Sequence, residues 1–278
     1  MTTRITWLLL LAFSVFVGNA GADNWPAWRG ADRTDVSTET GLLSEWPEQG
    51  PELAWLSKKC GVGYAGFAVV DDNVYTMGAY KNDERLICLD AATGDVRWRL
   101  VMTESVLENG WGDGPRGTPT VDGEFIYAMA GDGTVVCAKA ATGDLVWRIN
   151  MQDLGGKVPN WGYTESVLVD GDRVVFTPGG ADGAVVAVDK LTGKKLWQSK
   201  DFTDRADYSS VIVAEHDGVR QYIQLTQKTL VGIAADDGRV LWTYPWPGRT
   251  AVVPTPIFRD GKVYIACGYG VGCGLVKI

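Results

Sequence analysis

Aromatic and charged residues recur at fixed positions in the chain, and they are its best candidates for ligand binding. Tyr64, Tyr163 and Tyr208 each lie 34 residues before a tryptophan that ends a repeated pattern. The matching segment of a further repeat reads Gly-Trp-Gly-Asp-Gly-Pro-Arg over residues 110–116. Aromatic plates beside a carboxylate and guanidinium groups can hold a planar cofactor or a sugar. The predicted binding residues are Tyr64, Trp111, Asp113, Arg116, Trp161, Tyr163, Arg205 and Tyr208. In the alternative interpretation, these periodic residues brace loops and pack between repeats.

Other kinds of chemistry find little support in the residue inventory. His216 is the only histidine, so a histidine triad, a histidine dyad and a zinc site with several histidines are excluded. It lies in a Glu-His-Asp-Gly stretch and is expected to be a solvated turn residue. The aspartates around Gly133 and Gly171 lack the repeated oxygen ligands of a calcium loop, and we expect turns there. No glycine-rich loop leads from a strand into a helix, so phosphate binding is not indicated.

The candidate residues belong to a repeat whose signature is Gly-x-x-x-Trp. Four segments carry it: LICLDAATGDVRW, VVCAKAATGDLVW, VVAVDKLTGKKLW and LVGIAADDGRVLW, which end at Trp98, Trp147, Trp197 and Trp242. Their tryptophans are 49, 50 and 45 residues apart, a period typical of stacked or radially arranged units. The glycine suits a tight turn with positive φ, and the tryptophan is a large apolar plate for filling the space between sheets.

Each repeat also contains a hairpin upstream of this signature. The predicted turns are Asp72-Asn73, Asp122-Gly123, Asp170-Gly171 and Asp260-Gly261, each between two short runs rich in β-branched and aromatic residues. One repeat therefore holds about four short strands, which is the make-up of a propeller blade. The expected fold is all-β, a β-propeller of four-stranded blades. Because tyrosines such as Tyr64 precede the innermost strand, we expect the binding residues around one mouth of the central channel.

The two ends of the repeat region predict an incomplete ring. Residues 52–55, Glu-Leu-Ala-Trp, resemble the last strand of a blade and are expected to close the ring, whereas the unit beginning near Val253 stops before any glycine turn or tryptophan. About five blades are represented, and we expect the N-terminal part of a ring of about seven or eight blades. A small propeller closed by strand exchange is the alternative. The expected domains are a signal peptide (1–22), an N-terminal segment with the ring-closing strand (23–56) and the repeats (57–278).

The N-terminus predicts export. Arg4 precedes an apolar run over residues 5–17, and Ala20 and Ala22 form an A-x-A cleavage pattern. We expect cleavage near Ala22, a periplasmic or secreted protein, and no integral membrane segment afterwards. The formal net charge of -8 argues against nucleic acid as a partner.

The cysteines match no known functional pattern. Five of them, Cys60, Cys88, Cys137, Cys267 and Cys273, fit neither a metal site nor a C-x-x-C redox motif. Cys88 and Cys137 occupy equivalent repeat positions, where we expect small buried strand residues; a disulfide is the alternative.

The pattern Asp-x-x-Thr-Gly-x-x-x-Trp, seen from Asp90 to Trp98 and from Asp189 to Trp197, resembles the PQQ-like β-propeller repeat family. The resemblance covers roughly residues 50–278, although Lys139 and Ala234 replace the aspartate in two repeats. The opening WPAWRG, from Trp25 to Gly30, is similar to the start of exported PQQ-like proteins of environmental bacteria. The enzymes of this family use pyrroloquinoline quinone (PQQ), a Ca²⁺ ion held by carboxylate and amide oxygens, and a catalytic aspartate, and several carry an adjacent cysteine pair. This chain has no adjacent cysteines and no haem-attachment motif.

Three functions remain open. The first is a non-enzymatic interaction scaffold that binds a protein partner, similar to the propeller subunit of the outer-membrane barrel-assembly machinery. The second is the N-terminal part of a PQQ- and Ca²⁺-dependent alcohol or sugar dehydrogenase. The third is carbohydrate binding at the aromatic mouth.

Overall fold

The structure, a computed structural model, describes residues 23–278; the predicted signal peptide, residues 1–22, lies outside the described residues. Five antiparallel sheets follow one another in chain order, and each is called a blade here. Blade 1 comprises β1 (Ala68–Val70), β2 (Asn73–Ala79), β3 (Glu84–Asp90) and β4 (Val96–Thr103). Blade 2 comprises β5 (Thr120–Asp122), β6 (Phe125–Met129), β7 (Thr134–Lys139) and β8 (Leu145–Asn150). Blade 3 comprises β9 (Leu168–Asp170), β10 (Arg173–Phe176), β11 (Val186–Asp189) and β12 (Lys195–Gln198).

Blade 4 comprises β13 (Ile212–His216), β14 (Val219–Leu225), β15 (Thr229–Ala234) and β16 (Val240–Pro245). Blade 5 has only three strands, β17 (Ile257–Arg259), β18 (Lys262–Cys267) and β19 (Gly272–Lys277). The one helix among the described residues is the short 3-10 helix η1 (Met151–Leu154). No helix in this part of the chain has the length and apolarity needed to cross a membrane. The predicted all-β fold with four-stranded blades and an incomplete last blade is confirmed.

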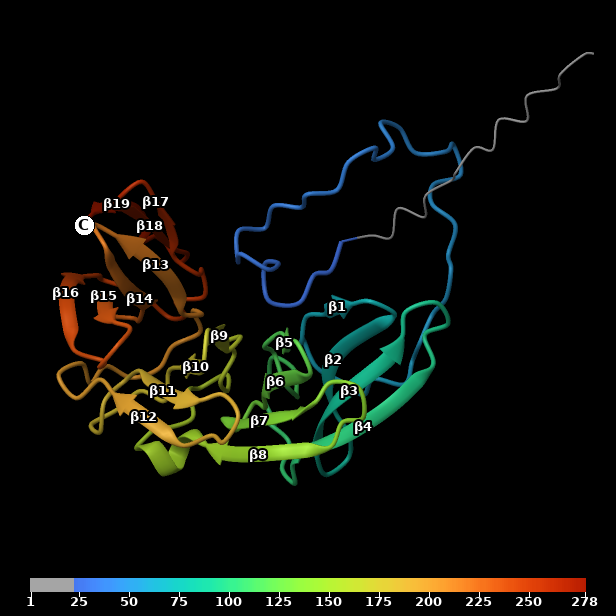
Figure 1. Cartoon of the computed structure of the whole chain (residues 1–278), viewed down its shortest axis with the longest axis horizontal. Coiled ribbons are helices and arrows are strands. Elements are labelled where there is room, and N and C mark those ends of the chain that lie inside the picture. Colours follow the sequence, from blue (N-terminus) through green and yellow to red (C-terminus); the bar gives the residue numbers. More distant parts are fainter. Residues whose placement is uncertain (1–22) are drawn as a thin grey trace, which may run out of the picture.

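The blades lie along an open arc. Figure 1 shows the first strand of each of blades 1–4 toward the middle of this arc and the fourth at its outer side, with a gap between blade 1 and blade 5. Four hydrophobic clusters form the core, and each of them joins two consecutive blades. Each sheet therefore buries its apolar side chains against its neighbour, as propeller blades do.

The repeat signature is the contact that holds consecutive blades together. The tryptophan of one blade packs against the glycine of the turn in the next, so that a Cβ added at Gly143 would lie 2.6 Å from the ring of Trp98. Gly143 has a φ of 77°, which glycine adopts without strain. Trp55, Trp98, Trp147 and Trp197 donate from Nε1 to the backbone oxygens of Ala91, Ala140, Lys190 and Ala235, respectively. The large side chain predicted to fill the space between sheets thus also anchors the next turn by a directional bond.

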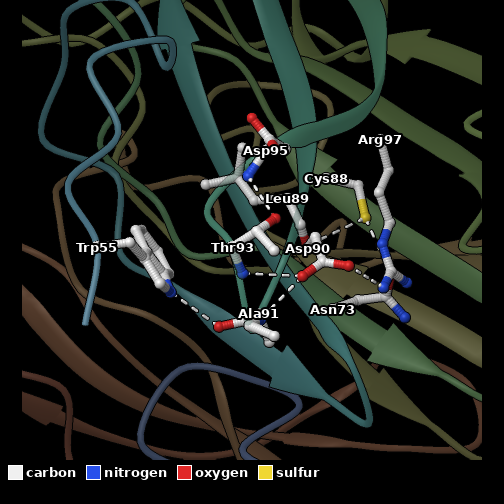
Figure 2. A network of polar contacts seen from close by, with 10 residues as sticks. Trp55, Asn73, Cys88, Leu89, Asp90, Ala91, Thr93, Asp95 and Arg97 are labelled. Carbon is white, nitrogen blue, oxygen red and sulfur yellow. Dashed lines mark hydrogen bonds and ion pairs between the residues drawn. The ribbon is translucent and has the colours of Figure 1, made fainter.

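Figure 2 shows this contact at the first turn, between Trp55 and blade 1. The Asp90 carboxylate accepts hydrogen bonds from the backbone N–H groups of Ala92 and Thr93, each at 2.9 Å, and it also pairs with Arg97. The aspartate of the signature therefore shapes the turn from which the Ala91 carbonyl meets Trp55. Residues 52–55 form no strand in the described chain, and the ring-closing strand stays a prediction.

Several local expectations are wrong. The first hairpin turns at Asp71-Asp72, one residue earlier than predicted, because Val70 pairs with Asn73 and Asp71 itself takes a φ of 50°. The second and third hairpins turn one residue later than predicted, at Gly123-Glu124 and Gly171-Asp172, because Asp122 pairs with Phe125 and Asp170 pairs with Arg173. His216 is not a solvated turn residue. It is the last residue of β13, its ring meets Phe258 edge-on at 6.1 Å, and its Nε2 lies 3.1 Å from the backbone oxygen of Ile278.

Candidate functional site

A pocket of about 380 Å³, here called the mouth pocket, lies where the chain enters the innermost strands. Segments leading into all five blades contribute to it, together with Trp28 from the N-terminal segment. Its large side chains are those of Trp28, Tyr64, Arg116, Trp161 and Tyr208. The smaller lining residues are Gly66, Thr118, Thr164, Ser166, Ser210, Ala251, Val253 and Thr255. The sequence period thus brings four of the eight predicted binding residues into one cavity.

Hydroxyl groups on the pocket wall link successive blades. The backbone N–H of Thr118 donates to the Ser166 hydroxyl at 2.8 Å, and the N–H of Ser166 donates to the Ser210 hydroxyl at 3.0 Å. The Thr164 hydroxyl donates to the backbone oxygen of Tyr208 at 3.0 Å. These buried bonds fix the spacing of the blades at the mouth, so the aromatic side chains above them are held by a rigid support.

Arg116 is held from two sides. Its Nε donates to the Trp161 carbonyl at 3.0 Å, and Nη2 donates to the Gly112 carbonyl at 2.5 Å. Its guanidinium carbon lies 4.8 Å from the centroid of the Tyr64 ring, a distance within the range of cation–π interactions. The cation is therefore fixed in place before any ligand arrives.

Trp161 and Tyr208 form the second aromatic pair of the pocket. Their ring centroids are 5.5 Å apart and the planes are tilted by 57°. Burial raises the pKa of Tyr208 to about 12, so its hydroxyl stays protonated at neutral pH. The pair presents two apolar faces and one neutral hydroxyl group.

The other four predicted residues lie elsewhere. Trp111 is 78% exposed beside the pocket, where its carbonyl accepts from the Tyr64 hydroxyl at 3.1 Å, and exposed Asp113 accepts from the backbone N–H of Asn109. Tyr163 is 1% exposed and packs inside the cluster between blades 2 and 3. Arg205 lines a separate pocket. Tyr163 and Arg205 therefore do not belong to the mouth pocket.

The sequence analysis missed the N-terminal contribution. Residues 24–35, here called the strap, cross the middle of the arc and contact every blade. The backbone groups of Trp25 pair with those of Val69 in blade 1, and Val121 of blade 2 donates to Pro26. Trp28 Nε1 lies 3.4 Å from the Thr255 hydroxyl at the start of blade 5. The WPAWRG sequence was the available signal, but it gives no indication of these distant partners.

Arg33 anchors the strap to blades 3 and 4. It is 8% exposed and donates to the carbonyls of Ser166, Val167 and Val211. Glu165, fully buried nearby, accepts from the backbone N–H groups of Thr177 at 2.8 Å and Val211 at 3.1 Å. Burial raises the pKa of Glu165 to about 7, although these bonds and Arg33 oppose the shift. These contacts hold the strap in the interior of the arc, against blades 3 and 4.

Residues 23–278 contain no group of three or more His, Cys, Asp or Glu side chains that could hold a metal ion. Of the predicted turn aspartates, Asp132 accepts from Thr103, Ser105 and Thr134, and Asp170 pairs with Arg220 and Tyr222. Cys88 and Cys137 are buried on β3 and β7 and unpaired.

Comparison with known proteins places the fold. Among solved structures, the chain is similar to BamB from Moraxella catarrhalis, with a TM-score of 0.54, 18% identity and coverage of 81% of this chain and 61% of that one. It is also similar to quinohemoprotein alcohol dehydrogenases from Pseudomonas putida and Comamonas testosteroni. Their TM-scores are 0.53 and 0.56, with 18% and 15% identity; the coverage is 82% and 87% of this chain, and 44% and 46% of theirs.

The chain spans less than two thirds of the length of these structures, and at such identities the likeness shows the fold alone. No curated protein matches the sequence. The family model described as outer membrane protein assembly factor BamB matches residues 48–151 and 82–277, which together include the whole repeat region. The chain therefore belongs to this family of PQQ-like repeats and has the β-propeller fold.

Proposed function

We propose that the chain is a non-enzymatic binding scaffold that works outside the cytoplasm and holds a protein partner at the mouth pocket. The observation that carries the proposal is the pocket itself, in which Trp28, Trp161, Tyr64, Tyr208 and Arg116 converge. Trp, Tyr and Arg are the residue types that dominate binding energy at protein interfaces. The fold likeness to BamB supports the same class of function.

The surface around the pocket favours a macromolecular partner. Tyr64 is 60% exposed, and Trp111 beside it is the most exposed tryptophan of the described chain. Large aromatic side chains gathered on a surface are typical of interaction sites. A propeller that only braced its loops with these residues would bury them, as it buries Tyr163.

A photo-crosslinker placed at position 111 tests the proposal in the producing cell. We expect a discrete protein adduct, and we expect it to be lost when Tyr64→Ala removes an exposed wall of the pocket without touching the core. The control position is Arg259, the last residue of β17, whose side chain is 88% exposed. Equal adducts at both positions, or none at 111, would contradict a partner site at the mouth.

The dehydrogenase alternative is tested by titrating the full-length protein with PQQ and Ca²⁺, where a dehydrogenase would show saturable quenching of tryptophan fluorescence. Because no cluster of three ligating side chains is present among residues 23–278, we expect no saturable, Ca²⁺-dependent quenching of tryptophan fluorescence. Circular dichroism of the same sample controls for folding. Saturable quenching, followed by dye-linked oxidation of alcohols, would replace the scaffold by the enzyme.

A further inference from the structure

Arg116 forms no ion pair with a residue of the described chain, and the Glu84 carboxylate interacts with it only at longer range. It is the only charged residue that lines the mouth pocket, and no carboxylate of the described chain lies within ion-pair distance of it. Its two hydrogen bonds go to backbone carbonyls, and Nη1 makes none within residues 23–278. A half-buried guanidinium in apolar surroundings is stabilised most strongly by an anion that accepts from its free N–H groups.

The groups around Arg116 define the rest of the ligand. The paired rings of Trp161 and Tyr208 line the pocket together with Trp28 and exposed Val253, and these side chains favour an apolar ligand group. Arg116 lies within cation–π distance of the Tyr64 ring, so its charged plane is already oriented. The complementary ligand carries an acceptor for Arg116 directly beside an aromatic or aliphatic group.

We propose that the mouth pocket recognises a single carboxylate next to an apolar side chain, presented by an extended segment of a partner protein, with Arg116 as its receptor. This inference rests on the scaffold function proposed above and names the chemistry that the scaffold selects.

Charge and shape decide between related ligands. The net charge of -8 disfavours an acidic run or a phosphate, which carries about two negative charges, so one carboxylate is the best match. A free small acid would occupy only part of the 380 Å³ pocket, and it would leave the adjoining exposed faces of Tyr64 and Trp111 uncovered. A peptide that runs over the rim covers both.

The test is calorimetric titration of the full chain with two peptides that differ only in charge, acetyl-Gly-Asp-Phe-Gly-amide and acetyl-Gly-Asn-Phe-Gly-amide. We expect the Asp peptide to bind about tenfold more tightly, as expected for a hydrogen bond between two charged groups. Arg116→Gln should remove this preference, because the Asp peptide loses its charged partner, and Arg116→Lys should restore part of it. Arg205→Gln, which alters an exposed arginine outside the pocket, is the matched control and should keep the full preference.

The outcomes separate the two proposals. Equal binding of both peptides, failure of both to bind, or a preference that survives Arg116→Gln would overturn the carboxylate assignment. In each case, a Tyr64-dependent adduct at position 111 would keep the scaffold function. Tighter binding of phenylacetate or of the phosphoserine analogue than of the Asp peptide would also overturn the assignment, in favour of a small acid or a phosphate.

Discussion

Replacing Trp147 by alanine is expected to lower the free energy of unfolding by about 3–5 kcal/mol. The side chain is 8% exposed, its Nε1 donates to the Lys190 carbonyl at 2.9 Å, and its ring lies 6.0 Å from that of Tyr127. It also packs against Gly193 in the turn of the next blade. Truncation therefore opens a cavity between blades 2 and 3 and removes one of the two hydrogen bonds that the Lys190 carbonyl accepts, the other coming from the Tyr127 hydroxyl. Urea unfolding, followed by circular dichroism, measures the loss.

Trp111→Ala is the control, because it removes the same side chain from a position that is 78% exposed. We expect a change of less than about 0.5 kcal/mol in the free energy of unfolding. If both variants were destabilised equally, the tryptophans of the signature could not be the anchors between blades.

Arg33→Ala is expected to destabilise the fold by about 2–4 kcal/mol, since it leaves buried carbonyls unsatisfied. The guanidinium is shared by the carbonyls of Ser166, Val167 and Val211, so one substitution releases the strap from blades 3 and 4 together. Burial lowers the pKa of Arg33 to about 10, and the side chain still carries its charge at neutral pH. Urea unfolding gives the stability, and trypsin cleavage after Arg29 gives the release of the strap.

Two further variants make the result specific. Arg33→Lys keeps the charge but not the planar fork, and we expect it to recover less than half of the loss. Arg259→Ala removes an exposed arginine and should leave both readouts unchanged. A wild-type cleavage rate in Arg33→Ala would refute the anchoring role.

The blades were predictable because their signals are local. A glycine turn and a tryptophan four residues later specify one hairpin and one contact with the next blade, and neither depends on distant sequence. The error at the first hairpin has an equally local cause. Asp71 takes the left-handed conformation with a φ of 50°, and aspartate tolerates this region better than most side chains.

The mouth pocket was predictable only in part. Tyr64 and Tyr208 share one repeat position and line the same pocket, because equivalent positions in a propeller face the same end of the channel. The position of a residue within the repeat does not determine the direction in which its side chain points. Tyr163 follows the same spacing, yet its hydroxyl donates to the Pro178 carbonyl inside the blade. Trp28 belongs to no repeat, and its place depends on contacts that no local pattern encodes.

The strap has a consequence for the order of folding. Arg33 bonds to Val211 across 178 residues, and Trp28 reaches Thr255 across 227. Each blade can assemble from neighbouring sequence soon after synthesis, whereas the strap has to wait until its most distant partners exist. The first described residues of the chain are therefore expected to dock last. Until they dock, the inner edges of the blades stay accessible to solvent. Folding is therefore completed only when the strap, which is synthesised first, packs against the inner strands.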